Sequence, residues 1–310
     1  MISRRNIRVK VMQTLYALES GSPDGISLSP EKLLTSKFLQ TRNLFTYIIY
    51  FISEVARYAE KDAHIKGNKH LPTAEDLSVN TKISGNELPW LTFENNSFHQ
   101  VVKDAHLEHI TDVELVKKMY QQLVQSEEYK DYISISARTK KNEKKILEYI
   151  LNHILLPNEE FCSHIEEHFI NWDDDAEQMQ ILATNYFNKP NGCNFNEILG
   201  EEKKDFAFSL LKTVKDKEEI NLSMIKEKLK NWDADRIAAL DMIMLHMGLC
   251  EMLYFETIPT RVTINEYIDL AKAYSTPQSG QFVNGLLDTL NKELSSQNKI
   301  HKKVYKNSTL

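Results

Sequence analysis

The feature that most constrains the fold is residues 262–288, because it predicts two helices in close succession. Thr263 and Glu266 have the spacing of a capping box, which would start the first helix at this point. Val262 and Tyr267 are placed to form a hydrophobic staple across that helix start. We therefore expect a helix whose first turn begins after Thr263.

The second helix of this stretch is expected to follow at once. Thr276 is the predicted N-cap and Pro277 the first helical residue. Gly280 and Gly285 lie inside this helix, where each costs about 1 kcal/mol relative to alanine. Two explanations stay open: tight packing against another helix, or close approach of another molecule to the backbone. The expected apolar stripe consists of Phe282, Leu286, Leu290 and Leu294.

Apolar residues recur at helical spacing along most of the 310-residue chain, and no convincing run of alternating strands is found. Only 9 glycines and 8 prolines are present, concentrated in a few places, which suits a mostly helical protein. The length allows one large domain or two ordinary ones. The fold class is therefore predicted to be all-α.

Charge and cysteine content exclude several classes of protein. The net charge of −6 argues against a chain that binds nucleic acid over its whole surface, so any such binding must be local. Cys162, Cys193 and Cys250 form no CxxC motif, which indicates a reducing compartment. Because neither a signal peptide nor a long apolar run is found, we expect a cytoplasmic protein without a membrane partner.

Three arginines gather at the start of the first predicted helix, residues 3–19. Arg4, Arg5 and Arg8 face the positive end of the helix dipole, which costs a few tenths of a kcal/mol each. A bound anion, most simply a phosphate backbone, would compensate for this cost. The alternative is a basic helix end that is merely solvated.

The middle of the chain contains an irregular segment and a basic run. Residues 68–96 are expected to form a long ordered loop that buries Trp90, Leu91 and Phe93. A solvated helix face explains the basic run more simply than RNA contact does. The run consists of Arg138, Lys140, Lys141, Lys144 and Lys145.

The sharpest enzymatic motif is His164-Ile165-Glu166-Glu167-His168, which fits the zinc-binding pattern H-x-x-E-H. No residue marks a third protein ligand, and the same residues fit an exposed helix face. Phosphate-binding and dinucleotide-binding glycine motifs are also missing from the sequence. We therefore expect a protein that is not an enzyme and has no catalytic residues, metal site or cofactor.

Several dispersed motifs, in the right order, resemble the bacterial transcription antitermination factor NusB family. The resemblance covers the first helix and roughly residues 206–294. The matching segments are Arg4-Arg5-x-x-Arg8, Met12-Gln13-x-Leu15-Tyr16, residues 247–253, Ile258-Pro259, residues 262–266, residues 270–272, residues 282–285 and Leu287-Asp288.

The resemblance implies a domain organisation. Family members have about half this length, so residues 20–196 are interpreted as a large helical insertion after the first helix. The predicted division is an N-terminal helical region at 1–196, a NusB-like core at 197–295 and a basic tail at 296–310. The implied fold is a NusB-like bundle of two helical subdomains with an enlarged N-terminal half.

The resemblance also implies a function and its residues. The expected role is binding the boxA element of ribosomal RNA leaders together with the ribosomal protein NusE, within an antitermination complex on RNA polymerase. Phe282 could either contact RNA or belong to the core. An alternative function is a helical protein-interaction scaffold that has lost RNA binding. The implied RNA-binding residues are Arg4, Arg5, Arg8, Ser279, Gln281, Phe282 and Asn284, and the implied protein-partner residues are Tyr16, Asp241 and Glu251.

Overall fold

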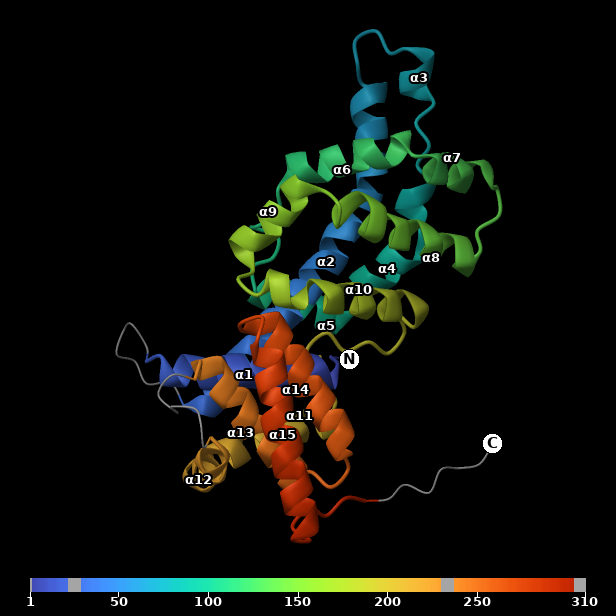
Figure 1. The fold of residues 1–310 in the computed structure, drawn as a ribbon. Helices are drawn as coiled ribbons and strands as arrows, with labels where there is room; N and C mark the ends of the chain where they lie inside the picture. The colour runs from blue at the N-terminus through green and yellow to red at the C-terminus, as the bar shows by residue number, and fades with distance from the viewer. Residues whose placement is uncertain (1, 22–28, 230–236, 304–310) are drawn as a thin grey trace. The chain divides into compact units, whose positions relative to one another are not determined.

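The computed structural model describes residues 2–21, 29–229 and 237–303, and these residues form helices and no strands (Figure 1). The all-α prediction is therefore confirmed for this part of the chain. Residues 22–28 of the predicted insertion and 304–310 of the predicted basic tail lie outside the described residues.

The helices form two compact units that do not follow the order of the sequence. Unit 1 contains Ile2 and residues 38–198. Unit 2 contains the described residues of 3–37 and 199–303, so the first helix belongs with the C-terminal helices. Arg4, Arg5 and Arg8 are thereby in the same unit as the stretch 262–288 from the opposite end of the sequence.

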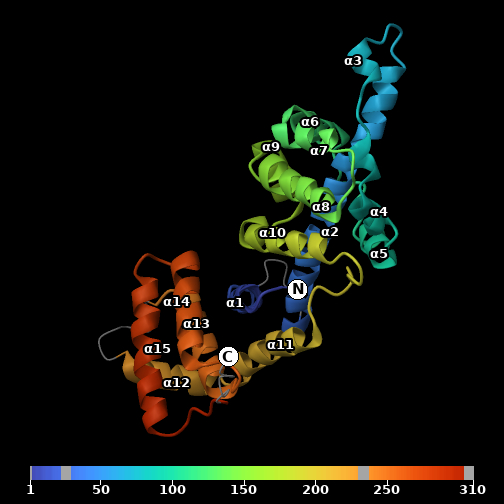
Figure 2. The same cartoon turned by 90° about the vertical axis from the view of Figure 1, so that its right-hand side faces the viewer.

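Unit 1 is built around the long helix α2, with shorter helices around it (Figures 1 and 2). Its core is rich in aromatic rings: the Phe195 ring stacks on that of Phe45 at 5.5 Å between centroids and meets those of Phe98 and Tyr186 edge to face. The elements of this unit are α2 (Pro30–Gly67, from residue 38 onward), α3 (Ala74–Leu77), η1 (Lys82–Gly85), α4 (Glu87–Phe93), α5 (Asn96–Asp104), α6 (Val113–Gln125), α7 (Glu127–Ser134), α8 (Lys140–Tyr149), η2 (Ile150–Leu155), α9 (Glu159–His168) and α10 (Trp172–Asn188).

The prediction of an irregular loop at residues 68–96 is wrong, because this segment forms α3, η1 and α4. Thr73 and Asp76 make a reciprocal capping box at the start of α3. The Asn86 side chain caps α4 by accepting the N–H of Leu88. Trp90 is not buried as expected but 59% exposed. Local capping residues thus outweighed the apparent turn signals.

Unit 2 is organised around α13 (Ala239–Tyr254), whose residues are buried on nearly all sides. Helices α14 and α15 pack side by side against it, and both views show this three-helix layer (Figures 1 and 2). Helices α1, α11 and α12 also contact α13. The further elements of this unit are α1 (Arg4–Glu19), α11 (Glu201–Asp216), α12 (Glu218–Lys228), α14 (Thr260–Tyr274) and α15 (Ser279–Ser296).

The predicted start of α14 is wrong, because the helix begins at Thr260, with Pro259 at the N-cap position. Thr263 is therefore inside the helix and fully buried, and its hydroxyl donates to the Glu251 carboxylate at 2.8 Å rather than capping. Val262 is 44% exposed, so it forms no staple with Tyr267. The sequence pattern predicted that the Thr263 hydroxyl caps the helix start, but this hydroxyl is hydrogen-bonded to the buried Glu251 carboxylate of α13 instead.

Helix α15 begins at Ser279, two residues after the predicted start at Pro277. Thr276 still lies at this end, where its N–H donates to the Ser279 hydroxyl at 3.2 Å. The core-facing row of the helix is rotated from the expected stripe, leaving Phe282 and Leu286 half-buried. That row consists of Val283, Leu287, Leu290 and Leu294.

The glycines of α15 differ from one another in their surroundings. A Cβ on Gly280 would come within 2.8 Å of the Lys272 side chain on α14, whereas a Cβ on Gly285 would meet nothing within 4 Å. A glycine on α13 is also closely packed by another helix, since a Cβ on Gly248 would lie 3.0 Å from the Leu287 side chain on α15. Tight packing therefore explains Gly280 in part and does not explain Gly285.

Candidate nucleic-acid interface

A buried charge network ties α1 to α13 and α14. The Arg8 guanidinium donates to both carboxylate oxygens of Glu251, at 2.9 and 2.8 Å. It also donates to Glu266 on α14 at 3.2 Å. Glu251 accepts two further hydrogen bonds, from the hydroxyls of Thr263 at 2.8 Å and Tyr267 at 3.2 Å. Both oxygens of this buried carboxylate are thus satisfied from two other helices.

Burial and pairing act in opposite directions on Arg8, whose exposed fraction is only 2%. Burial alone would lower the pKa of Arg8, but the hydrogen bonds and charge of Glu251 outweigh it and raise that pKa above its ordinary value. Burial and the Glu251 charge also raise the pKa of Tyr267 well above its usual range, so its phenol keeps the proton it donates. In this arrangement Arg8 faces Glu251 and Glu266 and not the solvent.

The other two arginines of the predicted cluster are more accessible. Arg5 is exposed, and Arg4 is 39% exposed beside Glu202 of α11, with 2.5 Å between nitrogen and oxygen. Glu202 is 81% exposed, so water screens this pair and an anion can compete for the guanidinium. At the start of α1, Arg5 is therefore accessible to an anion. Arg4 can bind an anion if it gives up its contact with the exposed Glu202 carboxylate.

At the start of α15, Ser279 is buried and joins this helix to α13. Its hydroxyl donates to Asp241 at 2.6 Å, and Asp241 is itself only 5% exposed. Because Asp241 lies in the first turn of α13, the positive end of that helix favours its negative charge. Ser279 and Asp241 thus form a second buried anchor between these helices.

The next residues of α15 present polar groups outward. Gln281 and Asn284 are exposed, and Phe282 is half-buried between them. The exposed Gly285 follows without a side chain. This combination of amide groups, a partly open ring and accessible backbone suits contact with splayed bases of a single strand.

The two ends of the predicted interface are held at different points of α13. Arg8 is anchored at Glu251 and Ser279 at Asp241, which are separated by ten helical positions. At 1.5 Å per residue the anchors lie about 15 Å apart along the helix. An extended ligand would be needed to reach both.

Sequence reasoning missed the partners that hold Arg8. Thr263, Glu266 and Tyr267 all contribute polar atoms to its network from α14. Their spacing of three and four residues places them on one helix face, a pattern that the capping interpretation concealed. The predicted protein-partner residues also divide, since Tyr16 is 44% exposed whereas Asp241 and Glu251 are buried.

The H-x-x-E-H motif on α9 has another explanation in unit 1. His164 shares a hydrogen bond of 2.6 Å with the Tyr47 hydroxyl, and its ring meets that of His168 edge to face. Burial and the nearby His168 lower the pKa of His164. Among the described residues, no group of three or more side chains is arranged to hold a metal ion.

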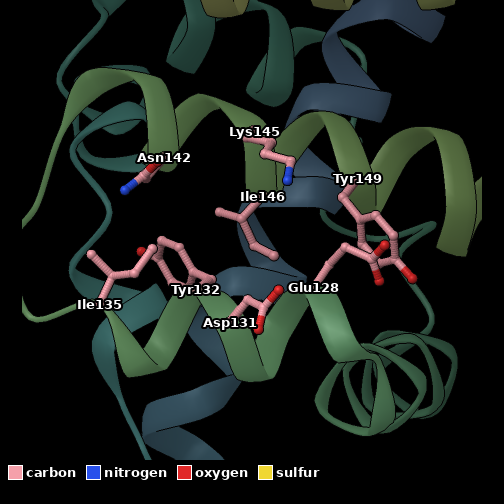
Figure 3. Close-up of a pocket in the computed structure, with 8 residues that line it drawn as sticks. All are labelled: Glu128, Asp131, Tyr132, Ile135, Asn142, Lys145, Ile146 and Tyr149. Atoms are coloured by element: carbon pink, nitrogen blue, oxygen red, sulfur yellow. The ribbon is translucent and has the colours of Figure 1, made fainter.

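The basic run divides between two faces of α8. Lys145 lines a small cavity of about 60 Å³, across from Glu128 and Asp131 on α7 (Figure 3). Lys140, Lys141 and Lys144 instead line a groove of about 580 Å³ with Lys189 and α4. All residues of the run are exposed except the half-buried Lys144, so most of the run faces solvent, in agreement with the solvated-face interpretation.

No described helix combines the length and apolar character needed to cross a bilayer.

Comparison with known proteins identifies a family model, described as the NusB family, that matches residues 170–292. The relative from Salinibacter ruber, named transcription antitermination protein NusB, is 42% identical over 103 residues, covering 32% of this chain and 62% of the relative. The protein of the same name from Natranaerobius thermophilus is 35% identical, and the aligned region covers 32% of this chain and 76% of that protein.

A third relative with this name, from Chloroherpeton thalassium, is 37% identical over 32% of this chain and 47% of its own length. The chain thus spans about half to two-thirds of the length of two of these relatives. A solved structure of T. maritima NusB has 28% identity and a TM-score of 0.31, covering 44% of this chain and 89% of its own.

Proposed function

Because this chain belongs to the NusB family, we propose that it acts in transcription antitermination. The observation that carries the proposal is the family match, which includes all of α13 and α14 and most of α15. These helices carry the polar residues that suit RNA contact. The role rests on this region and not on residues 38–169, which the family model does not match.

The proposed ligand is single-stranded RNA of the boxA type from ribosomal RNA leaders. Arg5 and Arg4 bind phosphates at the start of α1, while Gln281 and Asn284 form hydrogen bonds with base edges. Phe282 stacks on a base with the exposed part of its ring. Exposed Gly285 leaves room for the strand to approach α15.

Arg8 and Ser279 take a positioning role in this proposal. Arg8 is held by Glu251, and Ser279 by Asp241, so neither side chain is available without breaking a buried contact. Together they fix the starts of α1 and α15 on the common support of α13. To contact RNA, Arg8 would have to leave the Glu251 carboxylate. The negative charge of Glu251 would then be buried and unpaired.

We further propose NusE, a ribosomal protein, as the protein partner, within an antitermination complex on RNA polymerase in the cytoplasm. Tyr16 is the accessible member of the predicted partner residues. Asp241 and Glu251 are buried and act by holding in place the helices that form the surface. With a net charge of −6, the chain binds RNA modestly by itself, and the partner raises that affinity. In this role the protein binds and assembles, and catalyses no reaction.

A titration separates this function from that of a scaffold without RNA binding. The full chain is titrated into a fluorescent boxA-like RNA and a scrambled RNA, at several salt concentrations, with and without NusE. An antitermination factor binds the boxA-like RNA more tightly, weakens with salt and gains affinity with NusE. A scaffold that has lost RNA binding shows no salt-dependent anisotropy change with either RNA.

A further inference from the structure

We propose that the lysine-lined groove of unit 1 is a second, sequence-independent binding site for the phosphates of single-stranded RNA. Its walls come from α8, from α4 and from the end of α10 with the turn that follows it. The proposal rests on the proposed function, because it takes the flanking strand of the RNA that unit 2 binds. No family relationship points to it, since most of the groove lies outside the matched residues.

Four lysines converge on this groove from two parts of unit 1. Lys140, Lys141 and Lys144 come from the first turns of α8, and Lys189 follows the last residue of α10. Lys140 and Lys144 are one helical turn apart on α8. The Lys144 ammonium donates to Asn188 at 2.5 Å and pairs with Glu148 at 3.3 Å. Lys140, Lys141 and Lys189 are a local excess of positive charge on a chain whose net charge is negative.

The carboxylates near the groove do not neutralise this excess. Glu143 is buried, accepts the Tyr132 hydroxyl at 3.0 Å and lies 3.3 Å from Arg138. Glu148 pairs with Lys144 alone, at 3.3 Å. Within the described residues no ion pair uses Lys140, Lys141 or Lys189, all of which are exposed. Glu87 at the start of α4 is the remaining acidic group of the lining.

The start of α8 repeats an arrangement found at the start of α1. Each helix begins with two consecutive basic residues, Lys140-Lys141 and Arg4-Arg5, at the end where the helix dipole is positive. Each pair is disfavoured by that dipole unless an anion approaches. The groove thus combines the electrostatic feature proposed for RNA contact in unit 2 with a cavity of about 580 Å³.

The rest of the lining indicates a phosphate backbone and not a base-specific site. The exposed amide of Asn191 can donate to phosphate or ribose oxygens, whereas the Asn188 amide donates to the Thr184 carbonyl and accepts from Lys144. The aromatic ring in the lining, Phe187, is only 4% exposed and offers little surface for stacking. Lysine acts as a point charge towards phosphate, so this site adds affinity and salt dependence without reading sequence.

The test compares a minimal boxA-like RNA with the same RNA extended by single-stranded uridines, using the full chain. The extended RNA should bind more tightly and with a steeper salt dependence. The variant Lys140→Gln with Lys141→Gln should reduce the logarithmic salt slope for extended RNA by about 1.4, since each single-stranded phosphate contact contributes about 0.7. Binding of the minimal RNA should stay unchanged.

Matched controls keep the test specific. Lys103→Gln with Lys145→Gln removes the same charge from exposed lysines of unit 1 outside the groove and should leave both RNAs unaffected. Lys189→Gln removes one groove lysine from a different element and should reduce the slope by about half as much. Acylation of lysines read by mass spectrometry should show protection of Lys140, Lys141 and Lys189 by extended RNA.

Other outcomes overturn the proposal. Equal binding of the two RNAs, or equal effects of the groove and control variants, would mean that the groove holds no phosphate. Protection of the groove lysines by polyglutamate but not by extended RNA would assign it to an acidic protein. If the minimal RNA fails to bind, the function proposed for unit 2 fails separately, and oligouridine alone then tests the groove: lysine-dependent binding supports it and no binding overturns it.

Discussion

The two units hold their polar groups in different ways. In unit 2, a guanidinium with 2% exposure lies against a fully buried carboxylate, Arg8 on Glu251. In unit 1, hydroxyls rather than a guanidinium donate hydrogen bonds between two buried side chains, as in the 2.6 Å hydrogen bond between Thr92 and Tyr186 in a cluster of aromatic rings. Rings fill space and tolerate small adjustments, whereas a buried ion pair fixes one arrangement of its helices.

The two units therefore depend to different degrees on single residues. The Arg8 network joins three helices of the unit that carries most of the family match. Removing one partner of this pair leaves an uncompensated charge, whereas removing the Tyr186 hydroxyl of unit 1 leaves one unpaired neutral group.

Arg8→Ala should lower the free energy of unfolding of unit 2 by about 3–5 kcal/mol, because Glu251 would stay buried without its cation. Arg8→Lys should also destabilise, since a lysine cannot donate to both carboxylate oxygens in the same fork geometry. Urea denaturation followed by circular dichroism measures both variants. A change below about 1 kcal/mol in Arg8→Ala would show that the network does not secure α1.

The acid stability of unit 2 should depend on His246. Burial lowers the pKa of His246 to about 4, whereas its ordinary value is 6.5. Between these values the unfolded chain binds a proton that the folded chain does not. The contribution of neutral His246 to the free energy of unfolding is therefore fully present above about pH 6.5 and is lost as the pH falls towards 4.

Between pH 7 and pH 5 this loss amounts to about 2 kcal/mol. His246→Gln, which cannot titrate, should lose correspondingly less stability over the same interval, as measured by urea denaturation at each pH. An identical pH dependence in the two proteins would mean that His246 is protonated as readily in the folded chain as in the unfolded one.

Two glycines of unit 2 should respond to alanine in opposite directions. Gly248→Ala should destabilise by about 1 kcal/mol, because the new Cβ meets Leu287 and the buried Tyr267 at 3.0–3.3 Å and overpacking outweighs the gain in helix propensity. Gly285→Ala should stabilise by about 0.5–1 kcal/mol, because nothing lies within 4 Å. Thermal melting compares the pair, and effects of the same sign would refute this packing account.

Tyr186→Phe provides the direct contrast to Arg8→Ala, with a small expected effect. The substitution removes the hydrogen bond to Thr92 but keeps the ring contacts with Phe45 and Phe195. A loss of about 1 kcal/mol is expected in urea denaturation. A loss as large as that of Arg8→Ala would mean that the two units do not differ in this respect.

The helical class could be predicted from the sequence because apolar spacing of three and four residues recurs throughout. Helix starts were less predictable, since capping patterns occur inside helices as well as at their ends. Thr263 fits a capping box, yet its hydroxyl is used by Glu251, twelve positions earlier in the chain. Sequence spacing alone gives no sign of such a tertiary partner.

The residues of the candidate site were found as a group, but their accessibility was not. Arg4, Arg5 and Arg8 look equivalent in the sequence, and only helix packing separates the exposed Arg5 from the buried Arg8. The predicted apolar stripe of α15 was wrong by one position, since Phe282 and Leu286 were expected in place of Val283 and Leu287. With a helical period of 3.6 residues, either of these two adjacent rows could face the core. Burial of polar groups depends on neighbours that local patterns do not contain.

A matched pair of double variants tests whether the starts of α1 and α15 form an RNA-binding surface. Arg5→Gln with Asn284→Ala removes an exposed guanidinium and an exposed amide of the proposed surface, while Arg261→Gln with Gln297→Ala removes the same two kinds of exposed group elsewhere in unit 2. Both are titrated against boxA-like RNA by fluorescence anisotropy. If these residues contact RNA, only the first variant should bind more weakly and with a shallower salt slope than the unmodified chain. Equal affinity of both variants and the unmodified chain would contradict RNA contact by these residues.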